Sequence, residues 1–101
     1  MLVPSAAQFG VVVVQQVLVD GVEQPTLMPK LPVGTRRIQI HYAGMSFLMP
    51  SRLLFRTRLL GFEQEWVDRG NQDVAEYTNL PPGDYEFQVM ATYPDLKWPQ
   101  Q

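Results

Sequence analysis

Two stretches decide the fold of this chain: Leu59–Trp66 (LLGFEQEW) and Tyr77–Phe87 (YTNLPPGDYEF). The second contains a Pro-Pro-Gly turn, and Tyr85 then opens an alternating strand with its ring on the buried side. A buried tyrosine hydroxyl needs a hydrogen-bond partner, and the tyrosine corner of Ig-like sandwiches supplies one from the nearby backbone. These stretches therefore predict a corner of a β-sandwich, and they bring no catalytic group with them.

Alternation of apolar and polar side chains predicts several more strands, each with one buried face. Val11–Val19 reads as a strand, and Asp20-Gly21 as a tight hairpin turn that returns through Val22–Gln24. No segment keeps a helical apolar period over three turns. We therefore expect an all-β, antiparallel, Ig-like or fibronectin III-like sandwich of about seven strands. The inward-facing residues would be Ile38, Ile40 and Tyr42; Leu53, Phe55, Thr57 and Leu59; and Tyr85, Phe87, Val89 and Ala91.

The length and the net charge of the chain limit how many domains it can contain and which partners it can bind. Its 101 residues suit one domain, which we place at 11–98, with a flanking segment at 1–10 and a tail at 99–101. We expect the flanking segment to be ordered only if something tethers it. The net charge of −2 argues against nucleic acid as a partner. The longest valine run, Val11–Val14, is far shorter than the ~20 residues of a spanning helix, so we expect no direct membrane insertion of this segment.

Few side chains in this sequence are candidates for catalysis or metal binding. Glu63, Glu65 and Asp68 surround Trp66 and could hold calcium or exchange protons. The turn lacks the Asp/Asn spacing of a calcium loop, however, and a single acidic turn of this kind is usually solvated. His41 is the only histidine and the chain has no cysteine, so the usual zinc ligands are missing. We therefore expect no metal, no cofactor and no enzymatic activity.

Two aromatic residues have more than one interpretation. Trp66 follows the Gly61-Phe62 turn, and we expect it to fill the space between the sheets. Trp98 could plug the core or contact a neighbouring domain. If Trp66, Trp98 and Tyr93 were exposed, they could instead stack on sugar rings, as in carbohydrate-binding sandwiches.

An apolar loop, Met45–Pro50, separates two predicted strands. It could cap the end of the core, or it could form a surface for a partner, because methionine and phenylalanine side chains adapt to different partners. The candidate partner residues are Met45, Phe47, Leu48 and Met49.

From about Leu31 to Trp98, the ordered set of motifs resembles the three-tyrosine, or Y_Y_Y, domain of bacterial sensor proteins. Tyr77 and Tyr85 match two of its three signature tyrosines, whereas Thr57 stands where the first would fall. We expect that departure to repack the core or to alter a contact surface. The residues that match the family signature are Gly61, Phe62, Trp66, Tyr77, Asn79, Leu80, Pro81, Gly83, Tyr85, Phe87 and Trp98.

The resemblance implies a non-catalytic periplasmic relay domain of an inner-membrane protein. Such domains typically follow a β-propeller and precede a transmembrane helix that leads to a histidine kinase or a diguanylate cyclase. The domain would transmit ligand state by changing how two copies pair, so a homodimer is expected. The alternative is an accessory carbohydrate-binding or spacer sandwich of a secreted protein. Only Pro94–Gln101 follow the Tyr85 strand and its turn, so a free edge there would also favour self-association.

Overall fold

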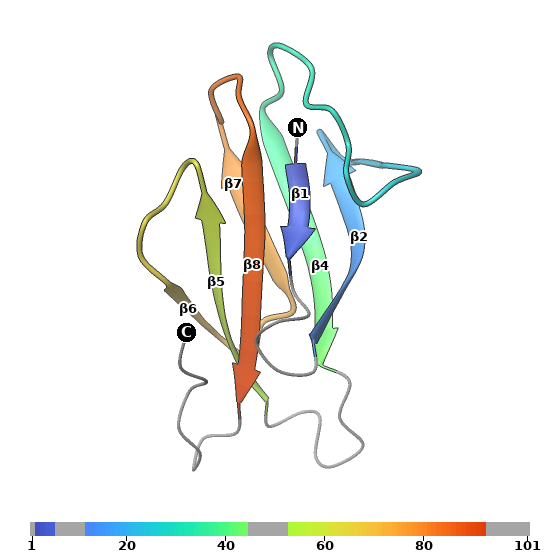
Figure 1. The fold of residues 1–101 in the computed structure, drawn as a ribbon. Helices are drawn as coiled ribbons and strands as arrows, with labels where there is room; N and C mark the ends of the chain where they lie inside the picture. The colour runs from blue at the N-terminus through green and yellow to red at the C-terminus, as the bar shows by residue number, and fades with distance from the viewer. Residues whose placement is uncertain (1, 6–11, 45–52, 93–101) are drawn as a thin grey trace.

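The structure is a computed structural model and describes residues 2–5, 12–44 and 53–92 (Figure 1). These residues form eight strands and no helix, arranged as two packed sheets of four strands each. Sheet A has the order β1-β8-β5-β6, and sheet B has the order β3-β2-β4-β7. The strands are β1 (Leu2–Ser5), β2 (Val12–Val19), β3 (Val22–Glu23), β4 (Arg37–Gly44), β5 (Leu54–Leu60), β6 (Val67–Gly70), β7 (Val74–Thr78) and β8 (Tyr85–Thr92).

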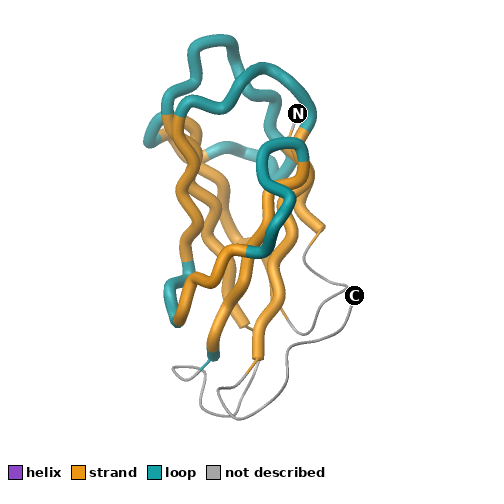
Figure 2. The backbone as a smooth tube through the Cα atoms, turned by 90° about the vertical axis from the view of Figure 1, so that its left-hand side faces the viewer, coloured by secondary structure: helices purple, strands orange, loops and turns teal. Residues whose placement is uncertain are grey.

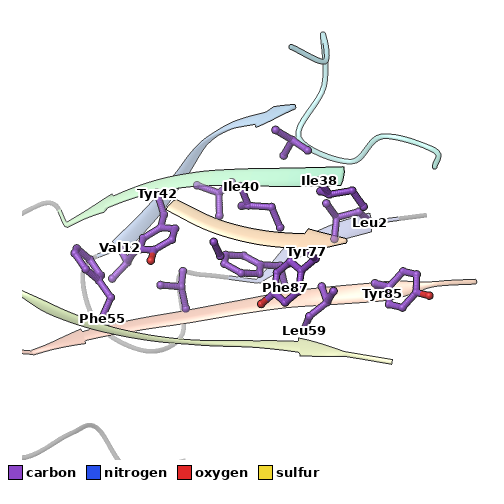
Figure 3. Close-up of a cluster of buried hydrophobic side chains, with 14 of the residues drawn as sticks. Leu2, Val12, Ile38, Ile40, Tyr42, Phe55, Leu59, Tyr77, Tyr85 and Phe87 are labelled. Atoms are coloured by element: carbon purple, nitrogen blue, oxygen red, sulfur yellow. The ribbon is translucent and has the colours of Figure 1, made fainter. Parts of the chain in front are cut away.

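The core lies between the two sheets and contains most of the predicted inward-facing residues, together with residues of β1, β2 and β7 (Figure 3). Ile38, Ile40 and Tyr42 are each 1% exposed, and they face Leu59 and Phe87 of sheet A, which are 0% exposed. The ring of Tyr42 packs edge-on against Phe55, with 5.0 Å between ring centroids. The expected all-β sandwich with a one-sided pattern on β4 and β5 is therefore confirmed.

The hairpin between β2 and β3 forms where the sequence predicts it. Asp20 and Gly21 adopt φ values of +50° and +83°, which a two-residue hairpin turn requires. The Asp20 carboxylate also accepts hydrogen bonds from the backbone amides of Arg36 and Arg37, at 2.8 and 2.9 Å. The turn is thereby tied to the chain segment that enters β4.

Strand β8 differs from the expectation of one buried and one solvated face. Of its predicted inner residues, Tyr85, Phe87 and Val89 are buried and Ala91 is partly buried against the core. Gln88, Met90 and Thr92 on the opposite face are also only 4, 4 and 7% exposed. The side-chain oxygen of Gln88 accepts two hydrogen bonds from the Arg58 guanidinium, at 2.9 and 2.6 Å. The long Arg58 side chain of the neighbouring strand β5 lies directly opposite Gln88 on this outer face, a cross-strand contact that simple alternation does not predict.

Strand β1 was not expected from the sequence. It pairs in parallel with β8, from Leu2 beside Tyr85 to Ser5 beside Gln88, and the Leu2 side chain is 1% exposed in the core. The Leu2 amide also donates to the carbonyl of Pro29, at 3.1 Å. Part of the predicted flanking segment is therefore tethered and belongs to the sandwich.

Figure 2 shows that most of the described loops gather at one end of the sandwich. Among the residues that the structure describes, no helix is long and apolar enough to cross a membrane. The predicted partner loop with Met45, Phe47, Leu48 and Met49 lies outside the described residues, and so do Tyr93 and Trp98.

Candidate functional site

A tyrosine corner lies at the loop-rich end of sheet A, as the sequence predicts. The Tyr85 hydroxyl donates a hydrogen bond to the backbone carbonyl of Pro81, four residues upstream. Gly61 packs against the same corner with φ +99°, and a Cβ there would lie 2.7 Å from the carbonyl oxygen of Asp84 and 3.0 Å from the Tyr85 ring. Glycine is required at position 61 both by the backbone conformation and by this close approach.

Tyr77 is the second signature tyrosine and joins the two sheets near the β5–β6 connection. Its hydroxyl donates to Glu63 Oε1 at 3.0 Å, and that same oxygen accepts the Leu59 amide at 3.1 Å. The Phe62 ring packs edge-on against the Tyr77 ring, with centroids 6.1 Å apart. The Gly61-Phe62 turn and the carboxylate that follows it therefore position Tyr77.

Thr57, at the position where the sequence resemblance places the first signature tyrosine, is 0% exposed. Its hydroxyl accepts a hydrogen bond from Arg69 Nε at 2.9 Å, and Arg69 Nη2 reaches the Tyr77 hydroxyl at 3.4 Å. The Arg69 guanidinium also lies over the Tyr77 ring, 5.6 Å from its centroid. We call Thr57, Glu63, Arg69 and Tyr77 the polar cluster. Arg69 was not singled out in the sequence, because only the packing of β6 beside β5 brings it to this position.

The electrostatics of the buried tyrosines indicate a structural role. Burial raises the pKa of Tyr77 to about 12, and the neighbouring Glu63 carboxylate contributes to the increase. Burial also raises the pKa of Tyr42, whose hydroxyl donates to the carbonyl of Gln72 at 2.8 Å. Both hydroxyls therefore remain neutral hydrogen-bond donors near neutral pH, and neither is prepared to accept a proton.

Trp66 lies elsewhere than predicted. It is half-buried and does not belong to the core between the sheets, and the Arg58 guanidinium stacks over it at 4.5 Å. Arg58 points away from that core because its neighbours Thr57 and Leu59 on β5 point into it. Trp66 therefore covers the outer face of sheet A, where its indole ring shields a cation that also holds Gln88.

The three acidic residues around Trp66 have different structural roles. Glu63 belongs to the polar cluster, Glu65 is exposed, and Asp68 accepts the Gly70 amide at 3.1 Å. His41 is half-buried on β4, opposite Val74. Within the described ranges, no three His, Cys, Asp or Glu side chains come together as a metal site would require.

The remaining signature residues shape the turn between β7 and β8. Asn79 adopts φ +55°, and its amide donates to the carbonyl of Arg36 at 2.9 Å. Leu80 packs partly buried against the core, and Phe87 is fully buried in it. Within the described residues, the signature thus defines a β-sandwich whose turns are fastened by buried tyrosines.

The comparisons with known proteins agree with this class. Residues 46–101 match the Y_Y_Y domain, and the chain belongs to this family. No curated protein matches the chain. Among solved structures, it is similar to the extracellular domain of a protein described as a hybrid two-component system, BT3049, from B. thetaiotaomicron, with a TM-score of 0.71 and 21% identity. The match covers 93% of this chain and 14% of that chain, so the present chain spans a small part of its length.

Proposed function

We propose that this chain is a non-catalytic relay domain in the periplasmic part of a membrane-bound bacterial signalling protein. In this role it transmits ligand state from an upstream sensor region, such as a β-propeller, to a transmembrane segment. The output is a histidine kinase or a diguanylate cyclase. The observation that carries the proposal is membership of the Y_Y_Y family. The similarity to one part of a larger extracellular sensor domain supports it.

The geometry of the described residues fits a relay better than a catalyst or a sugar-binding module. The polar side chains of the polar cluster bond to one another, so they hold the two sheets together instead of facing a substrate. An exposed planar row of aromatic rings would favour the carbohydrate-binding alternative. In the described part of the chain, Phe62 packs edge-on against Tyr77 and Trp66 lies beneath Arg58. The accessory spacer remains the alternative that experiment must separate from a relay.

The first experiment is to read the source gene on both sides of this segment. A downstream apolar span of ~20 residues that leads to a kinase or cyclase domain is the expected result. A stop codon soon after Gln101, or a secreted hydrolase on the same chain, would overturn the proposal.

A domain exchange then separates a relay from a spacer. In the intact parent, residues 1–101 are replaced by an unrelated Ig-like sandwich of similar length, and ligand binding and output are both measured. A relay predicts that ligand binding persists while ligand-dependent output is lost. Unchanged output with the unrelated sandwich would identify the chain as a spacer.

We also propose that two copies of this domain contact each other in the parent, and that the loop with Met45, Phe47, Leu48 and Met49 takes part. Single cysteines at Ser46 or at Val33 would be tested for disulfide cross-linking in membranes. Val33 is 91% exposed and precedes the opposite end of β4, so it is the matched control. We expect cross-linking at Ser46 and little at Val33; equal cross-linking at both sites would contradict a contact through this loop.

A further inference from the structure

The first and last described strands of this sandwich are hydrogen-bonded neighbours that run in the same direction. β1 pairs with the first half of β8, Leu2 beside Tyr85 and Ser5 beside Gln88, and β8 continues to Thr92. In Figure 1 the start of β1 lies at one end of the sandwich, and the end of β8 lies at the other. This is the only parallel pair among the described strands.

This parallel arrangement determines how the pair responds to tension. A pull on the chain before Leu2 and an opposite pull on the chain after Thr92 act along the two strands, in opposite directions. Inter-strand hydrogen bonds run across the strands, so such a pull loads all of them together, in shear. If β1 were antiparallel to β8, its first residue would lie nearer the end of β8, and the bonds would open one after another.

Leu2 anchors the short strand that carries this load. Its side chain is 1% exposed and belongs to the core that both sheets share, as Figure 3 shows. Its amide donates to the carbonyl of Pro29, in the segment that connects sheet B strands β3 and β4. Val3, the next residue, points outward and is 36% exposed. Sliding of β1 along β8 therefore has to pull Leu2 out of the core.

We propose that the β1–β8 pair is a shear clamp that carries tension directly from the chain before Leu2 to β8, the last described strand. This inference rests on the proposed relay function, in which force or displacement enters before Leu2 and leaves after Thr92. The clamp bypasses most of the sandwich, so an upstream displacement reaches β8 without unfolding the core.

Single-molecule force measurements on the 101-residue chain test the clamp through two pulling geometries. Handles at Met1 and Gln101 load the pair in shear. Handles at Met1 and at an introduced cysteine, Pro82→Cys, load it by peeling, because Pro82 is exposed in the turn that leads to Tyr85, the partner of Leu2. At equal force we expect β1 to be released at least about tenfold faster in the second geometry, since each additional bond broken at once is worth up to about a factor of ten. Equal lifetimes would overturn the clamp.

Matched substitutions in β1 test whether Leu2 determines the lifetime of the β1–β8 pair under shear. We expect Leu2→Ala to shorten the lifetime in the shear geometry about tenfold or more, Leu2→Met to retain most of it, and Val3→Ala to change it less than about twofold. Equal effects of Leu2→Ala and Val3→Ala would contradict the role of Leu2. The comparison of pulling geometries keeps the native β1, so it stands even if Leu2→Ala fails to fold.

The clamp and the relay can fail separately. A source gene without a downstream membrane span would defeat the relay and leave the difference between the two pulling geometries intact. Equal lifetimes in a chain from a confirmed membrane sensor would defeat the clamp alone.

Discussion

Thr57 shows how a small polar side chain is accommodated in the core between the sheets. Its buried hydroxyl accepts from Arg69, which in turn reaches the hydroxyl of Tyr77. Arg69 thus links the hydroxyl of Thr57 on β5 to the hydroxyl of Tyr77 on β7. One charge-assisted hydrogen bond from Arg69 therefore satisfies the only polar atom of the Thr57 side chain in the core.

Replacing Thr57 with valine keeps the side-chain shape and removes the acceptor for Arg69. We expect Thr57→Val to lower the free energy of unfolding by about 2 kcal/mol, because hydrogen bonds to charged groups contribute roughly 1.5–3 kcal/mol. Urea denaturation with an unchanged m-value is the measurement. Thr57→Ser keeps the hydroxyl and should cost about 1 kcal/mol, the worth of one buried methyl group. In an Arg69→Leu background the hydrogen bond is already absent, so Thr57→Val should lower the free energy of unfolding by less. An equally large decrease in that background would contradict this account.

Gly61 and Gly34 illustrate two different physical reasons why a position requires glycine. Both have positive φ, +99° and +87°, but only Gly61 has atoms within reach of an added Cβ. We expect Gly34→Ala to cost roughly 1 kcal/mol from backbone strain alone. Gly61→Ala should cost at least about 2 kcal/mol more, because the Asp84 carbonyl and the Tyr85 ring must move. Thermal unfolding of both variants checks this, and equal shifts in Tm would show that the corner tolerates the methyl group.

At the scale of single elements, the hairpin β2–β3 and the strand β1 are held by contacts with distant segments. Asp20 binds the amides of Arg36 and Arg37, and Leu2 binds Pro29. Both elements are short, β3 with two residues and β1 with four. Their own strand pairing is therefore small, and contacts with the segment between β3 and β4 fix where they lie.

The Asp20 contact gives a test by pH. Hydrogen bonds from the Arg37 and Arg36 amides hold the pKa of Asp20 below its ordinary value of 3.8. Because the pKa in the folded state is lowered, the contribution of the carboxylate to stability is present above the ordinary value and is lost as pH falls through the folded value. NMR shifts of the two amides should therefore titrate with a midpoint below 3.8. In Asp20→Asn the same shifts should stay flat; a midpoint at or above the ordinary value would contradict the contact.

At the scale of the whole molecule, the sandwich depends on buried tyrosines that extend hydrogen bonds to both ends of the core. Tyr85 fastens the turn before β8, Tyr77 joins the polar cluster, and Tyr42 binds the carbonyl of Gln72. Each hydroxyl donates only while it is protonated. The fold should therefore be sensitive to alkaline conditions as a unit.

Alkaline unfolding should show this dependence. Below about pH 10 both folded and unfolded chains keep their tyrosine protons, so the tyrosines add no pH dependence to the stability there. Between about pH 10 and the Tyr77 pKa of about 12, only the unfolded chain releases that proton, so the free energy of unfolding falls. The expected slope is up to about 1.4 kcal/mol per pH unit for each such tyrosine.

Circular dichroism at rising pH would follow the transition. Tyr77→Phe and Tyr42→Phe should each flatten the loss of stability with pH, even though each variant starts less stable at neutral pH. An equally steep loss in the double variant would show that other groups control alkaline unfolding.

Local pattern was sufficient to predict much of this protein. Alternation predicted the buried faces of β4 and β5, Asp20-Gly21 predicted the hairpin, and the Pro-Pro-Gly turn followed by Tyr85 predicted the tyrosine corner. These features depend on neighbours within a few residues, so a single sequence carries them. The ordered signature also predicted the family, because many individually weak motifs in the right order are specific together.

Other features were decided only by tertiary structure. Arg69 reaches Thr57 because β6 pairs with β5, and Gln88 on the outer face of β8 is covered by Arg58 because β5 pairs with β8. Trp66 covers Arg58 on the outer face of sheet A instead of filling the core, and that contact forms only once Arg58 on β5 points away from the core. Leu2 enters the core only through pairing with a strand about 80 residues away, and local sequence patterns do not encode contacts at that separation.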